Sequence, residues 1–237
     1  MFKNEVKTTK GEETRRRILS CALTLFRARG FAATTMREVA AEAGLSLGAA
    51  YHYFDSKEAI VLGYYDSVQS AHDQAVRLML PDTRGLRERI GAAMHAKFDI
   101  LEDDRPLMGA LLRFTGEPTH PLSFLGERTR PLQLRSIATF ARTVEEARLA
   151  GDLAELVPIT LWSLHMGLLL YFLYDDSPKQ RRTRQLTDGA VELFTRSLTL
   201  AKLPLLRPVR RRLAALLADA GLLPDATDLA RYQGMEA

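Results

Sequence analysis

The sequence predicts an all-α protein. No stretch of its 237 residues shows the apolar and polar alternation over four to eight positions that is typical of a strand. Apolar residues instead recur at the helical spacings of three and four positions. Glycines and prolines stand between these stretches, where one helix would end and the next begin. Together these observations predict short helices near the N-terminus and longer helices after them.

Three short helices are expected before residue 55. Apolar residues recur at helical spacing over 18–26 and again over 36–43, and each stretch is followed by a glycine. A third short helix is expected over 46–54. These helices can form one compact unit, so we predict an N-terminal domain at 1–55 and a larger helical domain at 56–237.

The predicted helices lengthen after residue 55, and residues 224–237 are expected to lack regular structure. The most apolar stretch, Ile159–Tyr174, is shorter than the roughly 20 apolar residues that a bilayer span needs. We therefore expect a buried helix there and no association with a membrane. The expected helices are 56–80, 84–103, 106–115, 121–150, 155–175, 179–201 and 208–220.

Composition and charge limit the class of protein. A single cysteine, Cys21, excludes a disulfide within the chain and a multi-cysteine zinc site. The N-terminus shows no apolar secretory segment, which together with the lone cysteine favours the cytoplasm. The formal net charge is +4, and residues 177–212 carry ten basic and two acidic side chains. This basic segment is read either as a solvated face or as a further surface for phosphate or an acidic ligand.

The stretch Thr34–Glu58 has the pattern of a helix-turn-helix. Thr35 and Glu38, three residues apart, form a capping box that begins a helix. Gly44 ends this helix, and Ser46 can cap the next one. The second helix of such an arrangement can enter the major groove of DNA, where its N-terminal residues meet the base edges.

The residue types that follow Ser46 suit contact with DNA. Gly48 and Ala49 are small, so the helix can approach the groove closely. Tyr51 and His52 have polar groups that can reach phosphates. Lys57 lies in the first turn of the next helix, where free N–H groups and a positive charge together suit a phosphate.

These motifs resemble the DNA-binding domain of the TetR family of bacterial repressors over about Thr14 to Tyr64. The matching motifs are R-x-I-L-x-x-A-x-x-L-F at 16–26, G-F at 30–31, T-T-x-x-x-V-A at 34–40, A-G-L-S at 43–46, Y-H-Y-F at 51–54 and S-K-E at 56–58. The resemblance implies an all-α homodimer in which the third helix reads DNA.

The resemblance also implies which residues contact DNA. They are Thr35, Arg37, Ser46, Leu47, Gly48, Ala49, Tyr51, His52, Tyr53 and Lys57. The chain departs from the family's pattern at 47–49, because these three side chains offer no hydrogen-bond donor or acceptor where bases are usually read. Apolar contact with thymine methyl groups and readout of DNA shape are therefore expected to contribute more.

In this family the last two long helices pair with those of a second protomer. Small residues four apart would allow close helix approach there, and an apolar stripe on the last long helix would complete the seam. The expected interface residues are Ser163, Gly167, Leu186, Ala190, Leu193, Phe194 and Leu198.

The resemblance further implies a pocket for a small, largely apolar effector between helices of the C-terminal domain. Candidates for its lining are chosen by composition: Met94, Phe98, Met108, Leu111, Arg113, Phe114, Trp162 and His165.

Two other functions were weighed against a ligand-responsive regulator. The sequence shows no Ser-His-Asp signature, metal-ligand run or Gly-rich phosphate loop, so we expect no enzyme activity, catalytic residue, metal or cofactor. An architectural or constitutive DNA-binding protein would need no effector pocket. The preferred hypothesis is a cytoplasmic repressor that binds a palindromic operator as a homodimer and is released by its effector.

Overall fold

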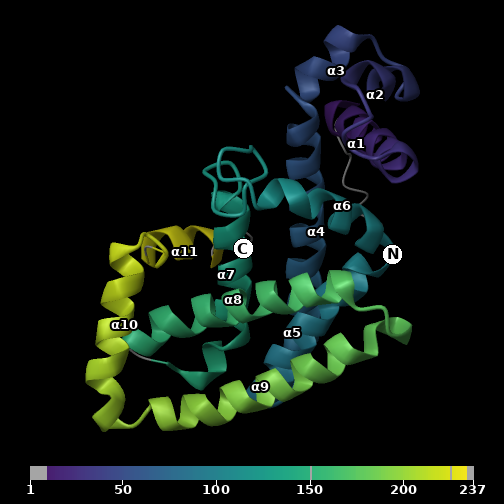
Figure 1. Ribbon diagram of the computed structural model, residues 1–237. Helices are drawn as coiled ribbons and strands as arrows, with labels where there is room; N and C mark the ends of the chain where they lie inside the picture. Colours follow the sequence, from purple (N-terminus) through teal and green to yellow (C-terminus); the bar gives the residue numbers. More distant parts are fainter. Residues whose placement is uncertain (1–9, 150, 225, 234–237) are drawn as a thin grey trace, which may run out of the picture. The chain divides into compact units, whose positions relative to one another are not determined.

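The structure, a computed structural model, describes residues 10–149, 151–224 and 226–233. Within these ranges every regular element is a helix and no strand occurs, which confirms the predicted all-α class (Figure 1). The chain forms two compact units. The N-terminal unit comprises the residues up to Ser67 together with Pro106–Thr129, and the C-terminal unit comprises Val68–Arg105 and the residues from Arg130 on. The single boundary predicted at residue 55 does not coincide with this division.

The N-terminal unit is built around the three short helices that the sequence predicts. Its helices are α1 (Lys10–Arg29), α2 (Met36–Glu42), α3 (Leu47–Tyr53), the first part of α4 (Lys57–Met79) and most of α6 (Arg105–Thr115). The core of the unit is apolar, and α1, α2 and α3 all contribute fully buried residues, among them Ile18, Val39 and Ala50. Phe54, directly after α3, is also buried.

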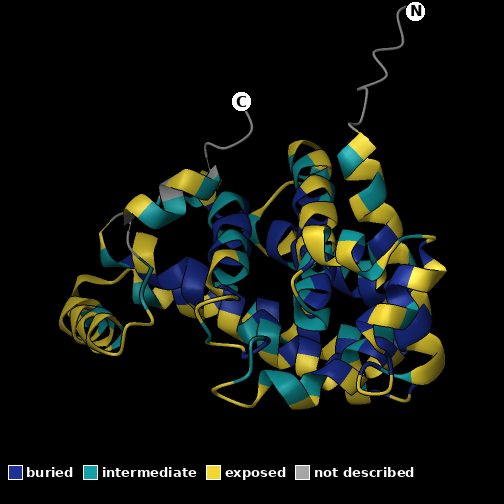
Figure 2. Cartoon of the chain, turned by 90° about the horizontal axis from the view of Figure 1, so that it is seen from above, coloured by how far each residue is buried: buried dark blue, intermediate teal, exposed yellow. Residues whose placement is uncertain are grey.

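The C-terminal unit is a helical bundle. Its helices are the second part of α4, α5 (Leu86–Leu101), α7 (Arg130–Thr143), α8 (Asp152–Tyr174), α9 (Arg181–Ala201), α10 (Arg207–Asp219) and α11 (Ala226–Gln233). Helix α7 packs against α5, α8 and α11, and α9 packs against α5 and α8. Figure 2 shows how buried and exposed residues are distributed along these helices, and α10 has no buried residue.

Two predictions about helices were wrong. The helix expected over 121–150 is shortened to α7, because residues 116–129 form turns closed by bonds such as Phe124 N to the Thr115 carbonyl at 2.9 Å. Two prolines and two glycines in this stretch oppose a helix. Residues 226–233, expected to lack regular structure, form α11 against α7. Residues 225 and 234–237 of that prediction lie outside the described ranges.

Helix α8 is long and apolar enough to span a bilayer by length and composition alone. However, 56% of its apolar window is buried inside the protein, as the sequence predicts for a core helix. Proteins of ordinary soluble folds contain such helices at their centres.

The junction between α8 and α9 is held by Asp175. Its carboxylate accepts bonds from the backbone N–H groups of Ser177 and Thr183 at 2.9 and 2.8 Å, and from their hydroxyls at 2.6 and 2.7 Å. Burial by itself would raise the pKa of Asp175, but these four bonds lower it far below its ordinary value. The carboxylate thus fixes where α9 begins relative to the end of α8.

Candidate nucleic-acid interface

Helix α2 begins at the predicted capping box. The Thr35 hydroxyl accepts a bond from the Glu38 backbone N–H at 3.2 Å, and the Glu38 carboxylate accepts from the Thr35 backbone N–H at 2.8 Å. The Thr35 hydroxyl also donates to that carboxylate at 2.9 Å. These bonds from Thr35, with the nearby charge of Arg29, lower the pKa of Glu38. Polar groups within four positions of each other therefore hold the start of the helix.

The turn and the start of α3 also follow from local chemistry. Gly44 has a φ of +65°, a conformation that glycine adopts without strain. Ser46 then caps α3, and its hydroxyl accepts a bond from the Ala49 backbone N–H at 3.2 Å. Because Ala50 is fully buried, the register of α3 is set and the opposite face is directed to solvent.

The exposed face of α3 carries small and aromatic residues. Gly48 and His52 are exposed, and the Tyr51 side chain is 48% exposed. The rings of His52 and Tyr53 lie edge to face with their centres 5.4 Å apart. A Cβ atom added at Gly48 would meet no atom within 4 Å, so packing within the chain does not require a glycine there. Leu47, Ala49 and Tyr53 are half-buried.

Arg37 is an exposed cation in the first turn of α2. Its guanidinium forms no hydrogen bond or ion pair with the residues that the structure describes, and it remains available for an anion. By contrast, the Thr35 hydroxyl, which the resemblance places near a phosphate, is engaged in the capping box.

Lys57 occupies a different environment from the one expected. Its ammonium donates to the Phe31 carbonyl at 2.8 Å and to the Ala32 carbonyl at 3.4 Å, and it lies 4.7 Å from the centre of the Phe31 ring. An ammonium has three donor hydrogens, so these carbonyls use most of its capacity. In the structure Lys57 therefore supports the turn after α1, and its contact with a phosphate stays a prediction.

Sequence reasoning missed a set of packed aromatic rings that joins α6 to the turn after α1. Phe31 makes edge-to-face contacts with Phe26 at 5.2 Å and with Phe114 of α6 at 5.1 Å, measured between ring centres. Phe114 also stacks on His120 at 5.0 Å. The sequence signal was the aromatic residue directly after Gly30, but its partner lies more than 80 positions away. Phe114 was instead assigned to the effector pocket.

The predicted effector residues are divided between the two units. Met94, Phe98, Trp162 and His165 belong to the C-terminal unit, and Met108, Leu111, Arg113 and Phe114 belong to the N-terminal unit. Within the C-terminal unit Phe98 and His165 do meet, with ring centres 5.6 Å apart. Within the N-terminal unit the Arg113 guanidinium lies over the Phe114 ring at 4.6 Å.

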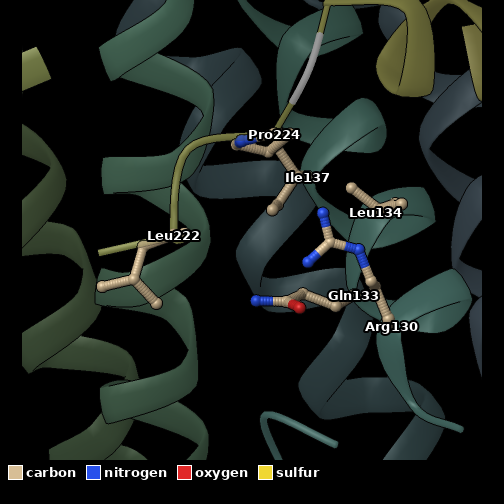
Figure 3. A pocket seen from close by; sticks show the side chains of 7 residues that line it. Arg130, Gln133, Leu134, Ile137, Leu222 and Pro224 are labelled. Atoms are coloured by element: carbon tan, nitrogen blue, oxygen red, sulfur yellow. The ribbon is translucent and has the colours of Figure 1, made fainter. Parts of the chain in front are cut away.

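A small pocket in the C-terminal unit has a different location (Figure 3). Its volume is about 10 Å³, which is space for one water molecule. None of the predicted effector residues lines it, so it does not test their assignment. Among residues 10–149, 151–224 and 226–233, no three possible His, Cys, Asp or Glu ligands come together for a metal. The pocket is lined by Arg130, Gln133, Leu134, Ile137, Gly221, Leu222 and Pro224.

All but one of the predicted dimer residues are at least partly exposed. Ser163, Gly167, Leu186 and Leu193 are exposed, and Ala190 and Phe194 are half-buried. Leu198 differs, because it is only 5% exposed and packs inside its own protomer. It is therefore better described as a core residue of α9. Further exposed apolar residues on these two helices are Leu170, Tyr171 and Tyr174 of α8 and Leu200 of α9.

Two family profiles match the chain. The profile described as bacterial regulatory proteins, tetR family, matches residues 18–64. The profile described as tetracyclin repressor-like, C-terminal domain, matches residues 89–211, which is more than half of the chain. The two matches include α2, α3, α6, α7, α8 and α9 in full.

Similar proteins of known name are regulators of transcription. The HTH-type transcriptional regulator YerO of Bacillus subtilis is 35% identical over 106 residues, covering 42% of this chain and 35% of YerO. The HTH-type transcriptional repressor KstR2 of Rhodococcus jostii is 35% identical over 119 residues, covering 45% of this chain and 58% of KstR2. The chain thus spans less than two thirds of the length of either relative.

The fold is also found in solved structures. The crystal structure of Thermus thermophilus FadR, in complex with lauroyl-CoA, superposes with a TM-score of 0.55 at 23% identity. The match covers 75% of this chain and 92% of FadR. The profiles, the helix-turn-helix and the shared fold lead to one conclusion: this chain belongs to the TetR family of DNA-binding transcriptional regulators.

Proposed function

We propose that the chain is a repressor that binds a palindromic operator as a homodimer and leaves it when a small effector binds the C-terminal unit. The observation that carries the proposal is the exposed face of α3, with Gly48, Tyr51 and His52, together with an exposed Arg37 on α2 that has no partner among the described residues. Small residues let a helix approach base edges, and the polar groups around them can contact phosphates.

The direct contacts are proposed by position. Ser46, Leu47, Gly48 and Ala49 face the bases, and Arg37, Tyr51 and His52 contact phosphates or groove edges. Tyr53 and Thr35 are secondary, because Tyr53 is half-buried and the Thr35 hydroxyl is engaged by Glu38. With no polar side chain at 47–49, discrimination among bases is expected to rest on thymine methyl groups and on DNA shape.

Dimerisation is supported by the exposed apolar face of α8 and α9. Ser163, Gly167, Leu170 and Tyr174 recur at helical spacing on α8, and Leu186 and Leu193 are seven positions apart on α9. A contiguous apolar face of this kind marks an interaction surface. A two-fold dimer would place two copies of α3 in successive major grooves about 34–36 Å apart.

An effector would act through its differential affinity for two arrangements of the protein. FadR, which shares this fold, was crystallised with lauroyl-CoA, so the fold can hold a ligand in that protein. For this chain the repressor role, the dimer, the effector and a cytoplasmic location without a membrane partner remain parts of the proposal, as does the absence of enzyme activity.

The proposal is tested first with DNA. The purified full chain should select a palindrome from random duplexes and bind it as a dimer, with an affinity that falls steeply as salt rises. Failure to select any sequence, at a salt concentration where the chain is folded and dimeric, would contradict operator recognition.

Induction is tested with Trp162, the only tryptophan of the chain and a buried residue of α8. An effector should change its emission and weaken operator binding, and operator should weaken effector binding by the same factor, because linkage is reciprocal. The coupling should be about 1–3 kcal/mol. Equal effector affinity with and without operator would favour a constitutive DNA-binding protein.

A further inference from the structure

We infer that a cluster of charged and imidazole side chains inside the C-terminal unit binds the anionic group of an organic acid, which is the effector of the proposed function. The buried polar cluster consists of His72 and Asp73 of α4, Lys97 of α5, Arg135 and Arg142 of α7, and His165 of α8. All six lie in the C-terminal unit. The inference rests on the proposed function, and it names the chemical class of the effector.

Asp73 is the centre of the cluster. Its carboxylate accepts a bond from Arg135 Nη2 at 2.9 Å and one from Arg142 Nη2 at 3.3 Å. The Gln69 amide donates to the same carboxylate at 2.8 Å, and so does the Thr139 hydroxyl. Four neighbours thus donate to the one carboxylate, three of them to Oδ1 and Arg135 to Oδ2.

Two buried cations of the cluster lack a carboxylate of their own. Arg142 pairs with Asp73, which also pairs with Arg135, and Lys97 forms no ion pair with the described residues. Lys97 and Asp73 are 7% and 5% exposed. Among the described residues the Lys97 ammonium donates one hydrogen bond, to the Gln69 side-chain oxygen at 2.9 Å, although an ammonium can donate three. Buried cations without a matching anion are costly, so the arrangement favours a second negative charge.

Burial acts on Lys97 in the expected direction. Loss of solvent lowers the pKa of Lys97 to about 7, with Asp73 opposing the shift and Arg135 adding to it. The charge of Lys97 acts on His72 of α4 and His165 of α8. Further titratable groups around the cluster are His95 on α5, which faces His165, and Arg77 on α4 and Arg135 on α7, which face Arg142. An anion beside Lys97 would restore the charged form.

Buried polar atoms without a hydrogen-bond partner concentrate at the same place. Arg142 Nε, His72 Nδ1 and His165 Nε2 are three of the five such atoms among the described residues. His72 Nε2 lies 2.8 Å from the Ala93 carbonyl and must donate to it, so His72 Nδ1 is an acceptor. The two imidazole rings are 6.0 Å apart. Arg142 and Lys97 can thus donate to an anion, while the imidazoles can accept from a hydroxyl or N–H of the same ligand.

Apolar rings adjoin the cluster. His165 makes edge-to-face contacts with Phe98 at 5.6 Å and Phe140 at 5.3 Å, and Phe98 stacks on Phe172 at 5.1 Å. On the other side the Arg135 and Arg142 side chains are each 19% exposed, so the cluster reaches the surface at α7. A molecule with an apolar body and one carboxylate suits this arrangement, because its body can contact the aromatic rings and its carboxylate the cations of the cluster.

The competing explanation is a network that only ties α4 to α7. The two explanations differ in what a neutral analogue should do. We would therefore measure binding of octanoate and octanol, and of phenylacetate and phenylethanol, to the full chain by Trp162 emission and calorimetry. Each pair shares its apolar body and differs in the head group.

The acids should bind wild type about ten-fold or more tightly than the alcohols, because a charge-assisted hydrogen bond contributes at least this factor. Lys97→Met should bring the acids to the level of the alcohols and leave the alcohols unchanged. Arg142→Met should act in the same direction. The control is Arg184→Met, which removes another ion pair of this unit, with Asp99 at 2.6 Å, and should keep the preference.

Proton uptake provides a readout that a purely structural network would not change. At pH 8 Lys97 is mostly neutral in the free protein, so an acid that recharges it should draw close to one proton from solution. Calorimetry in two buffers of different ionisation enthalpy measures this number. Uptake should occur with octanoate, not with octanol, and not in Lys97→Met.

Equal affinity for acid and alcohol, no binding of either acid, or a preference that survives Lys97→Met would overturn the inference. Operator binding is measured on the same preparations. If wild type binds the acids but recognises no operator, the proposed function is contradicted and the acid-binding site is retained. Acid binding that does not change operator affinity would retain the site and remove its role in induction.

Discussion

Polar side chains are used in opposite ways in the two units. In the N-terminal unit, Thr35 and Glu38 satisfy each other across three positions of sequence, and Ser46 caps α3 in the same way. In the C-terminal unit, the Gln69 amide meets Thr139 seventy positions away, and Lys97 meets Gln69 across 28. The first kind of contact holds a short helix and leaves its outer face bare, whereas the second kind brings charge into the core.

This difference has a consequence for recognition. A bare face of small side chains can accept a large, regular partner such as a DNA groove, because close approach is what it offers. A buried cation without an ion pair, such as Lys97, instead suits one small anion, since the low dielectric strengthens each contact. The two units therefore differ in the partner that their chemistry fits, and the predictions below test each side.

The largest effect is expected from separating the protomers, because operator affinity then loses its second half-site. Leu193→Glu places a charge on the exposed face of α9, where the native side chain is 66% exposed. Sedimentation should show monomers, and operator affinity should fall by about 10²–10⁴-fold. The free energy of unfolding of the protomer should change little. Leu78→Glu, at a leucine 71% exposed on α4, is the control and should remain a dimer.

The buried cluster should make stability depend on pH. Burial, with the charge of Lys97, lowers the pKa of His72 to about 3, below its ordinary value near 6.5. The unfolded chain therefore binds the proton more readily, and the free energy of unfolding should fall as pH drops from 6.5 toward 3. At pH 5 the loss from this group is about 2 kcal/mol. Denaturant unfolding of wild type and His72→Leu across this range should show a shallower fall in the variant; parallel curves would contradict the assignment.

Gly48 tests whether the bare face is shaped for DNA. A methyl group there meets nothing within the chain, so Gly48→Ala should stabilise α3 by about 0.5–1 kcal/mol. The same methyl should hinder approach to the groove and lower operator affinity about ten-fold, or 1.4 kcal/mol. Gly91→Ala on α5, also an open helical site, should raise stability without changing DNA binding. An unchanged operator affinity in Gly48→Ala would mean that α3 does not approach the bases closely.

The smallest effect is expected at Lys57, where local support and phosphate contact can be separated. Because its ammonium binds the carbonyls of Phe31 and Ala32, Lys57→Met should lower the free energy of unfolding by about 1 kcal/mol. Arg37→Met should not, since Arg37 has no partner among the described residues. The slope of log affinity against log salt should become shallower by about one for each cation that contacts a phosphate. An unchanged slope in Lys57→Met would assign Lys57 to structure alone.

The helix-turn-helix was predictable because its determinants are local. The capping box at Thr35, the left-handed Gly44 and the cap at Ser46 are all where the sequence places them. The residues that contact DNA stay a prediction, and the burial of Ala50 and Phe54 in the structure leaves the opposite face of α3 exposed. Helix lengths were less predictable: α7 is shorter than expected because the turns over 116–129 depend on bonds such as Thr129 to the Ser123 carbonyl.

The sequence alone determined the all-α class, the family resemblance and the order of the short N-terminal helices, because each depends on residues within a few positions of one another. Only the tertiary structure decided that 106–129 packs with the N-terminal unit, that Lys57 serves the turn after α1, and that Leu198 is buried. It also decided that Asp73 and Lys97 share one buried cluster. These outcomes depend on contacts between distant helices, whose partners are selected by packing of the whole unit and not by spacing along the chain.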